Sequence, residues 1–408
     1  MQLLISAGQV VTAADREPIR DGAVLVDDGV LTAVGPRAEV AAQAAADAHR
    51  AHHPTATLLP GLIDTHVHLV FDASPDPVGT LREQDDTALL LDMAGRARQL
   101  LEAGVTTVRD LGDRAGLALR LRHAVASGAL VGPRVLAAGP PLTPPGGHCW
   151  FLGGEVTGGE EALRQAVRDA VARGVDVVKV MATGGRLTKG GPDVWERQFS
   201  EAELRAVVAE AHAAGLPVAA HAHGTEGIAA AVAAGVDTLE HCTWMAKGGF
   251  DVRPELVGEI ADRGIRVCPA PSPNWRLFAE RFGQQAAKEL FARVRSMADR
   301  GVRLIAGTDA GVPHAVFDRF WSSLEFFAHL GFTPAQVLAM ATTEAAEALG
   351  VGGDTGRLAP GYRADLLVVE GDPLADLAAL REVRLVVAGG RPHVPSRAAV
   401  SATSGVSD

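Results

Sequence analysis

The chain has 408 residues, of which 47% are hydrophobic, 21% charged and only 4% aromatic. This length and apolar content allow a large buried core, in one α/β barrel or in two to three ordinary domains, and exclude disorder for most of the chain. A formal net charge of −11, without a long run of Lys or Arg, argues against nucleic acid and an anionic membrane surface as partners.

Cysteine usage and the first residues indicate the compartment. Cys149, Cys242 and Cys268 are far apart and show no Cys-x-x-Cys spacing, so neither a disulfide framework nor a thiolate zinc site is expected. The N-terminus lacks the basic segment and long apolar core of an export signal, and no apolar stretch is long enough to cross a bilayer. We therefore expect a soluble enzyme of the reducing cytoplasm.

Both ends of the chain have the pattern of short strands. In residues 1–57, Asp27-Asp28-Gly29 separates two runs rich in Val and Leu, which is typical of a hairpin. Short apolar runs return in residues 355–395. We predict that these two segments pair into one small β-sandwich, and that residues 396–408, which lack periodicity, form a mobile tail.

Residues 58–354 alternate strand-like apolar runs with helical segments rich in Ala, Leu, Arg and Glu. Examples are the run at 175–180 and the helical segment 201–214, which a further strand at 216–221 follows. The alternation predicts repeated β-α units with a parallel sheet, and eight such units fit this length as a (β/α)8 barrel, an α/β fold. Active sites of such barrels lie at the carboxyl ends of the strands.

Polar residues end several of these apolar runs. His66 and His68 lie one residue apart, so on a strand both imidazoles point to the same face and can reach one metal ion. The barrel topology predicts that they converge with the other residues in such positions, which are Lys179, His221, His241 and Asp309. Imidazole and carboxylate ligands suit zinc, manganese, iron and cobalt.

Lys179 points to a second metal ion. An ammonium group within the buried run Val177-Val178-Lys179-Val180 would be costly unless it were paired or chemically altered. Reaction of its amine with carbon dioxide would give an N6-carboxylated lysine, whose two oxygens can bridge two cations. Two metals sharing a hydroxide would supply a nucleophile and polarise a carbonyl. Asp309 would hold that hydroxide and shuttle its proton to the leaving nitrogen.

These residues resemble the metal-dependent amidohydrolase superfamily. The matching positions are the stretch Pro60-Gly61-Leu62-Ile63-Asp64-Thr65-His66-Val67-His68, Lys179, His221, His241 and Gly307-Thr308-Asp309-Ala310, and the resemblance extends over nearly the whole chain, including 356–366. Segments 101–110 and 179–185 resemble the branch of prolidase-like Xaa-Pro dipeptidases, N-acyl amino acid hydrolases and imidazolonepropionase relatives. The resemblance implies hydrolysis of an amide bond in a small molecule, with a dipeptide or N-acyl amino acid as the leading substrate class. It also implies a centre of two metal ions, commonly zinc, and relatives are often homo-oligomers.

Substrate contacts and one ligand have alternatives. Either His221 or His223 could be the strand-five ligand, because both have the same strand parity, and the resemblance favours His221. His223 would then serve catalysis by hydrogen-bonding the substrate, or would only support the ligands. His148, Trp150 and Arg186 follow predicted strands and would line the pocket, where Arg186 would pair with a carboxylate unless it is a solvated loop residue.

Three other functions compete with amide hydrolysis of a linear substrate. Ring opening of a cyclic amide or imidazolone needs the same kind of centre. A mononuclear deaminase is the second, but such enzymes commonly carry a glutamate three residues after the strand-five histidine, where this chain has Gly224. A non-catalytic scaffold is the third, although degenerate relatives would be expected to lack some of the ligands that this chain retains.

Overall fold

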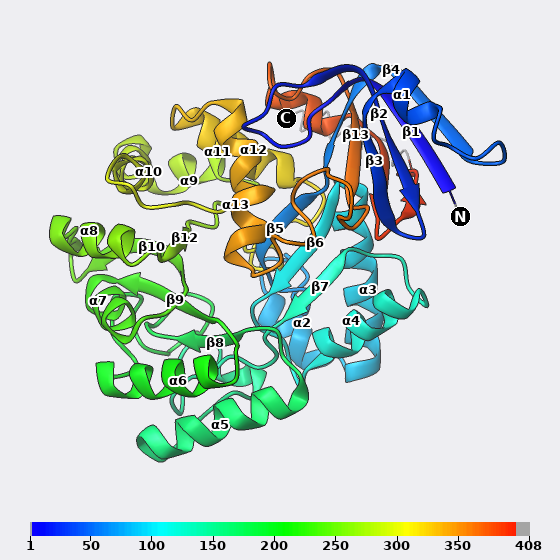
Figure 1. Cartoon of the computed structure of the whole chain (residues 1–408). Helices are drawn as coiled ribbons and strands as arrows, with labels where there is room; N and C mark the ends of the chain where they lie inside the picture. The colour runs from blue at the N-terminus through cyan, green and yellow to red at the C-terminus, as the bar shows by residue number, and fades with distance from the viewer. Residues whose placement is uncertain (1, 397–408) are drawn as a thin grey trace, which may run out of the picture.

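Strands from both ends of the chain form one sheet in the computed structural model, which describes residues 2–396 apart from the side chains of residues 281 and 282 (Figure 1). In spatial order its seven strands are β15 (Arg391–His393), β14 (Val383–Ala388), β13 (Leu366–Glu370), β4 (His49–Pro60), β1 (Gln2–Val10), β2 (Ile19–Asp27) and β3 (Val30–Pro36). Only β1 and β4 pair in parallel.

The β2–β3 hairpin confirms the turn predicted at Asp27-Asp28-Gly29. Asp28 and Gly29 have φ values of 45° and 85°. A two-residue turn with positive φ at both positions matches the right-handed twist of the flanking strands, and Gly is favoured there because it has no Cβ.

Both faces of this sheet are buried, because consecutive side chains of a strand point in opposite directions. Leu3 and Ile5 of β1 belong to a core that also includes Leu58 and Val368, whereas Leu4, between them, packs in a separate cluster. Helix α1 (Arg37–Ala41) contributes the buried Val40 to that second cluster.

Parallel strands occupy the middle of the chain. One sheet contains β5 (Leu62–Val67), β6 (Val105–Asp110) and β7 (Arg134–Ala137). The other contains β8 (Val178–Met181), β9 (Val218–Gly224), β10 (Thr238–Ala246) and β12 (Arg266–Cys268), all parallel, with β11 (Gly249–Phe250) antiparallel at the edge.

Single parallel bridges connect these strands to segments outside them. Leu142 pairs with Val180 of β8, Leu304 pairs with Val267 of β12, and Ala310 pairs with Val67 of β5. The chain is thus a mixed α/β protein, as predicted, and the strand alternation with helices is confirmed.

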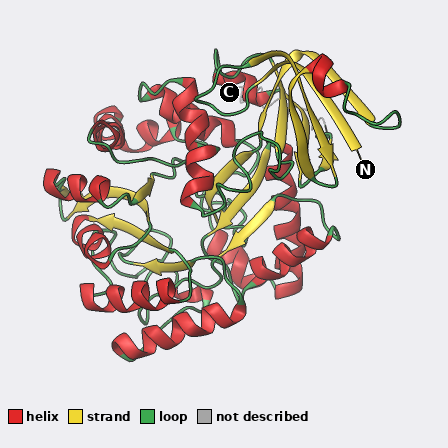
Figure 2. Cartoon of the chain, viewed as in Figure 1, coloured by secondary structure: helices red, strands yellow, loops and turns green. Residues whose placement is uncertain are grey.

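The helices lie around these strands (Figure 2). In chain order they are α2 (Pro77–Glu83), α3 (Asp86–Glu102), α4 (Leu117–Ser127), the 3-10 helix η1 (Trp150–Leu152), α5 (Gly159–Arg173), α6 (Glu201–Ala213), α7 (Thr225–Ala234), α8 (Pro254–Asp262), α9 (Arg276–Phe282), α10 (Gln284–Asp299), α11 (Phe320–His329), α12 (Pro334–Met340), α13 (Thr343–Ala348) and the 3-10 helix η2 (Leu377–Arg381).

Helix α6 matches the helical segment expected at 201–214. It begins after Ser200, whose hydroxyl accepts from the Glu203 backbone N–H while the Glu203 carboxylate accepts from the Ser200 N–H. This reciprocal capping satisfies two donors that the first turn leaves free. Within residues 2–396, no helix combines the length and the hydrophobicity that a transmembrane span needs.

The predicted mobile tail, residues 396–408, lies outside the described residues except for Ser396. The Ser396 hydroxyl donates to Oε1 of Glu102, at the end of α3, at 3.0 Å.

Leu367 of β13 joins the terminal sheet to the central strands. It is fully buried, belongs to the same core as Leu62 and Val105, and lies so close to Gly104 that a Cβ there would be 2.9 Å from its Cδ1. We expect Leu367→Ala to lower the free energy of unfolding by about 2–5 kcal/mol, because a cavity remains. Chemical denaturation tests this, with Leu91→Ala, at a site 69% exposed on α3, as the control that changes stability by less than about 0.5 kcal/mol.

Candidate metal centre

Six side chains that the sequence singled out lie together where the parallel strands end. A cavity of about 280 Å³ is lined by five of them, and His66 touches two of those five. The six residues, from β5, β8, β9, β10 and the segments that follow β5 and α10, are His66, His68, Lys179, His221, His241 and Asp309. The structure thus brings the predicted ligand set to one place.

His66, His68 and Asp309 present acceptor atoms to one another. The Nε2 atoms of the two histidines are 3.3 Å apart, and Oδ1 of Asp309 lies 3.3 Å from Nε2 of His66 and 3.4 Å from Nε2 of His68. Nδ1 of His68 donates to the carbonyl of Gly112 at 3.0 Å, so a neutral ring carries its lone pair on Nε2. Burial favours that neutral form, because it lowers the pKa of His68 far below its usual range.

The backbone that carries Asp309 is fixed against β5. Asp64 accepts from the Thr308 N–H at 3.1 Å and from its hydroxyl at 2.6 Å, and the Asp309 N–H donates to the carbonyl of His66 at 2.8 Å. Gly307 allows this approach, since a Cβ there would lie 2.6 Å from Sγ of Cys268. Asp309 itself has a φ of 57°, in the left-handed region that non-glycine residues rarely occupy.

Lys179 has no partner for its charge within hydrogen-bonding distance. Its side chain is 2% exposed, and Nζ is buried without a hydrogen-bond partner among the described residues. Burial lowers the pKa of this amine, which favours the neutral form. Two imidazole nitrogens and a carboxylate oxygen that lie together beside a buried, unpartnered amine fit a site that could hold a metal ion.

His221, His223 and His241 form a second donor cluster. They offer ring nitrogens that all lie within 4.8 Å of one another, and the rings of His223 and His241 are stacked with centroids 4.5 Å apart. Burial lowers the pKa of all three imidazoles, that of His223 to about 3, so they are neutral and can act as ligands.

The two candidates for the strand-five ligand have different neighbours. Nε2 of His221 lies 3.1 Å from the carbonyl of Gly184, which leaves Nδ1 for another partner. Nδ1 of His223 lies 2.9 Å from the hydroxyl of Thr243, which leaves Nε2.

A buried ion pair that sequence reasoning missed holds His66 in place. Oε2 of Glu240 accepts from Nδ1 of His66 at 2.9 Å, and Oε1 accepts from Arg109 at 2.8 Å and from Thr238 at 2.6 Å. Burial alone would raise the pKa of Glu240, but Arg109 and the His66 hydrogen bond bring it well below its usual range. The carboxylate is therefore ionised, and it directs the Nε2 lone pair of His66 toward His68 and Asp309.

Charged residues inside apolar strands were the available signal for this pair. Arg109 ends the run Val105-Thr106-Thr107-Val108, and Glu240 follows Thr238-Leu239. Two opposite charges on buried strands suggest an ion pair. The two residues are 131 positions apart in the sequence, so their pairing is identified only from the fold.

The predicted substrate contacts divide into two groups. His148, Arg186 and His223 line the cavity. His148 is 5% exposed, and its ring fits against Gly185, where a Cβ would be 2.3 Å from Nε2. Trp150, in contrast, is not among the described residues that line the cavity; it is 38% exposed and packs against Phe151.

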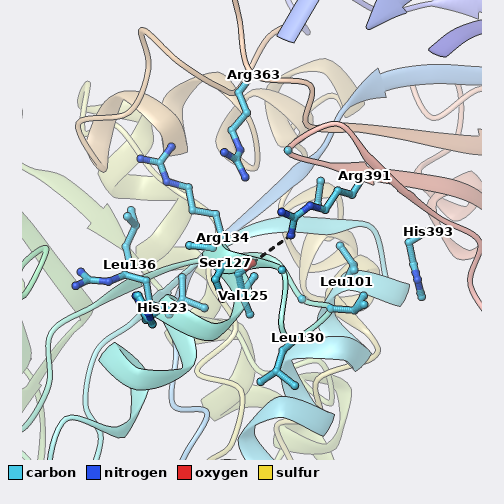
Figure 3. Close-up of a pocket in the computed structure, with 18 of the residues that line it drawn as sticks. Leu101, His123, Val125, Ser127, Leu130, Arg134, Leu136, Arg363, Arg391 and His393 are labelled. Carbon is cyan, nitrogen blue, oxygen red and sulfur yellow. Dashed lines mark hydrogen bonds between the residues drawn. The ribbon is translucent and has the colours of Figure 1, made fainter. Parts of the chain in front are cut away.

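A larger cavity, of about 780 Å³, lies away from these residues, between α4 and the C-terminal strands (Figure 3). Its arginines are engaged in structural contacts: Arg134 pairs with Asp354, Arg363 pairs with Asp365, and Arg391 donates to the carbonyl of Val125. Among the described residues, none of the clusters of His, Cys, Asp and Glu donors that could share an ion lies there. The smaller cavity is therefore the candidate for chemistry.

Comparison with known proteins identifies the family of this chain. The model of the amidohydrolase family matches residues 57–392. The chain belongs to the amidohydrolase family. It is similar to ochratoxinase from Aspergillus niger, with 30% identity over 94% of this chain and 84% of the relative, and to imidazolonepropionase from Salinispora tropica, with 27% identity over 96% and 98%.

A solved structure extends this likeness to the fold. A Xaa-Pro dipeptidase with bound methionine in its active site superimposes with a TM-score of 0.83 and 26% identity, covering 97% of this chain and 100% of the other. The amidohydrolase described here is thus a hydrolase that acts on carbon–nitrogen bonds of small molecules, and its family typically binds metal.

Removal of Glu240 should destabilise this amidohydrolase. We expect Glu240→Ala to lower the free energy of unfolding by about 3–5 kcal/mol, because Arg109, 2% exposed, is left as an unpaired buried charge. Chemical denaturation measures the loss. The double variant Arg109→Met, Glu240→Leu removes both charges and should recover most of it, whereas equal losses in the single and double variants would contradict the pairing. Glu255→Ala, on the exposed face of α8, is the control.

Proposed function

We propose that this amidohydrolase cleaves an amide bond in a dipeptide or an N-acyl amino acid, at a centre of two divalent metal ions. The observation that carries the proposal is the meeting of the Nε2 atoms of His66 and His68 with Oδ1 of Asp309 at 3.3–3.4 Å, beside the orphaned amine of Lys179. Similarity to a Xaa-Pro dipeptidase supports a dipeptide substrate, and similarity to ochratoxinase, an amide hydrolase, supports cleavage of an amide bond.

The proposed scaffold is a (β/α)8 barrel, residues 58–354, with a small β-sandwich from residues 1–57 and 355–395. The parallel strands of the two sheets support the barrel, as do the three parallel bridges that connect those strands to Leu142, Leu304 and Ala310. The core that strands of both termini share, including Ile5, Val24 and Val387, supports the sandwich.

We assign the metal ligands as His66, His68, Lys179, His221, His241 and Asp309, with Lys179 N6-carboxylated, so that it would offer the metal centre two oxygens in place of an amine. Burial of the Lys179 amine without a hydrogen-bond partner supports carboxylation, because burial lowers its pKa and a neutral amine is the form that reacts with carbon dioxide. The bound ions, commonly zinc in this family, would lower the pKa of water and polarise the scissile carbonyl. His221 is favoured over His223 by the family resemblance, and His223 is then free to contact substrate.

The chain's own residues would complete the reaction. The Asp309 carboxylate accepts the proton of the attacking water and delivers it to the leaving nitrogen, so that an amine and a carboxylic acid result. Burial raises the pKa of Asp309, which suits a group that must hold a proton between the two transfers. Glu240 keeps His66 oriented, and Arg186, His148 and His223 contact the substrate from the cavity wall.

Ring opening of a cyclic amide is the second candidate. The similarity to imidazolonepropionase over 96% of this chain supports it. In both reactions water adds to a carbonyl carbon and the bond from that carbon to nitrogen then breaks; they differ in whether the leaving nitrogen stays tethered to the product.

The reducing cytoplasm is the proposed compartment. The three cysteines, Cys149, Cys242 and Cys268, are all free thiols and all buried, and burial raises the pKa of each. They therefore give no disulfide that would call for an oxidising environment.

Lys179→Ala tests the bridging lysine. We expect loss of one of two metal ions and of most activity, with partial recovery when a short carboxylic acid such as acetate or propionate is added, because its two oxygens can replace the carbamate. Metal analysis and turnover are measured on the same preparation. Lys288→Ala, at an exposed position of α10 that does not line the cavity, should change neither. Full activity of Lys179→Ala would contradict the carbamate.

Asp309→Asn tests the proposed reaction. Wild-type protein should release amino acid from N-acyl amino acids and dipeptides, and the variant should retain its fold but lose about 100-fold or more in kcat, as removal of a general acid–base does. Amine release is followed by a ninhydrin-type assay and the fold by circular dichroism. Near-normal turnover of the variant would remove Asp309 from the proton transfers, and an inactive wild type on linear amides would favour ring opening.

A further inference from the structure

A second cavity, of about 340 Å³, opens beside the candidate centre. The two cavities have five wall residues in common: Arg186, His223, His241, Met245 and Pro313. A ligand that reaches the histidines in the first cavity can therefore extend into the second. A volume in this range is typical of pockets that enclose part of a small molecule.

The outer wall of this cavity is apolar and largely aromatic. It is lined by Leu290, Phe291 and Val294 of α10, by Phe326 of α11 and by Trp275, which directly precedes α9. The ring of Phe291 lies edge-on to Phe326 and to Trp275, with centroids 5.0 Å and 6.0 Å apart. Edge-to-face packing of this kind is the arrangement that aromatic rings prefer, so a further ring can join it.

Trp275 is anchored as a rigid part of that wall. Its Nε1 donates to the carbonyl of Ser322 at 2.9 Å, and the residue is 8% exposed. The polar atom of the indole is therefore satisfied within the protein, and the ring offers the cavity only its apolar surface. This part of the wall therefore contacts a ligand through hydrocarbon rather than through hydrogen bonds, whereas Arg293, Asn274 and Ser272 add polar atoms elsewhere in the lining.

The junction of the two cavities is polar. Arg186 and His223 line both cavities, so both side chains lie at this junction. Guanidinium groups bind carboxylates with two parallel hydrogen bonds. An amino acid whose carboxylate lies at this junction would direct its side chain toward the apolar wall.

We propose that the apolar cavity binds the side chain of the amino acid that the enzyme releases, and that the preferred substrates are N-acyl derivatives of aromatic or large aliphatic amino acids. This inference rests on the proposed function and adds its specificity. A glycine derivative would leave the hydrocarbon of Phe291 and Val294 in contact with water, whereas a benzyl group would cover it.

Wild-type specificity gives the first test. We expect kcat/KM for N-acetyl-L-phenylalanine and N-acetyl-L-leucine to exceed that for N-acetylglycine by about tenfold or more, since even one methylene in an apolar pocket changes kcat/KM by 10–200-fold. Equal values for the three substrates would overturn the inference while leaving the proposed function intact. Failure to hydrolyse any of them would contradict the proposed function itself.

Filling the cavity gives the second test. Val294→Phe adds a ring to the wall and should reduce the preference for N-acetyl-L-phenylalanine over N-acetylglycine by about tenfold or more. Val131→Phe, at a site 56% exposed and remote from the centre, should leave the preference unchanged. An unaltered preference in a folded Val294→Phe protein would overturn the inference.

Direct binding separates recognition from turnover. Calorimetric titration of Asp309→Asn with the same two compounds should show about tenfold or more tighter binding of N-acetyl-L-phenylalanine. Adding Val294→Phe to that variant should abolish the difference. Equal affinities in the Asp309→Asn protein would contradict an apolar side-chain pocket, whatever the rates of hydrolysis.

Discussion

Two imidazole nitrogens and one carboxylate oxygen lie within 3.4 Å of one another, and the surrounding hydrogen bonds fix them in that arrangement. His66 and His68 each have Nδ1 committed to an acceptor, Glu240 and the Gly112 carbonyl respectively. When both rings are neutral, their Nε2 atoms and Oδ1 of Asp309 are all hydrogen-bond acceptors, which repel one another. A cation among them removes that repulsion, so the arrangement of these three atoms suits a metal ion.

Contacts made by buried residues hold these three atoms close together. Asp64 and Gly307 hold Asp309 against β5 in a left-handed conformation, and His241 also has a positive φ, 70°, at its place in β10. Strained backbone of this kind persists only where the surrounding contacts over-determine it. The Arg109–Glu240 pair adds rigidity from two different strands, so the orientation of His66 depends on the packing of the whole strand assembly.

Sequence periodicity predicted much of this arrangement. The alternation of apolar runs and helical segments gave the α/β class, and the position of polar residues at the ends of those runs identified side chains that lie together in the structure. These features are local, because they depend on strand parity and on the direction of parallel strands.

Contacts between distant segments could not be obtained in that way. Glu240 and Arg109 are visible in the sequence as charges within apolar strands, but their pairing depends on the fold. Trp150 was expected at the cavity because it follows a strand near His148, yet a left-handed turn at Cys149, with φ of 59°, leads into η1 and leaves the indole partly exposed. The extent of the apolar cavity beside α10 likewise depends on the fold, because helices α9 and α10 and Phe326 meet only in three dimensions.

Metal content per subunit tests the central claim most directly. The measurement is elemental analysis of freshly purified protein, kept in bicarbonate-containing buffer without chelator. Two equivalents of a divalent first-row metal are predicted, held by the paired histidines, the carboxylated lysine and Asp309. One equivalent would contradict the bridged centre and favour a mononuclear deaminase, and no metal after supplementation with zinc or manganese would contradict a metal-dependent hydrolase altogether.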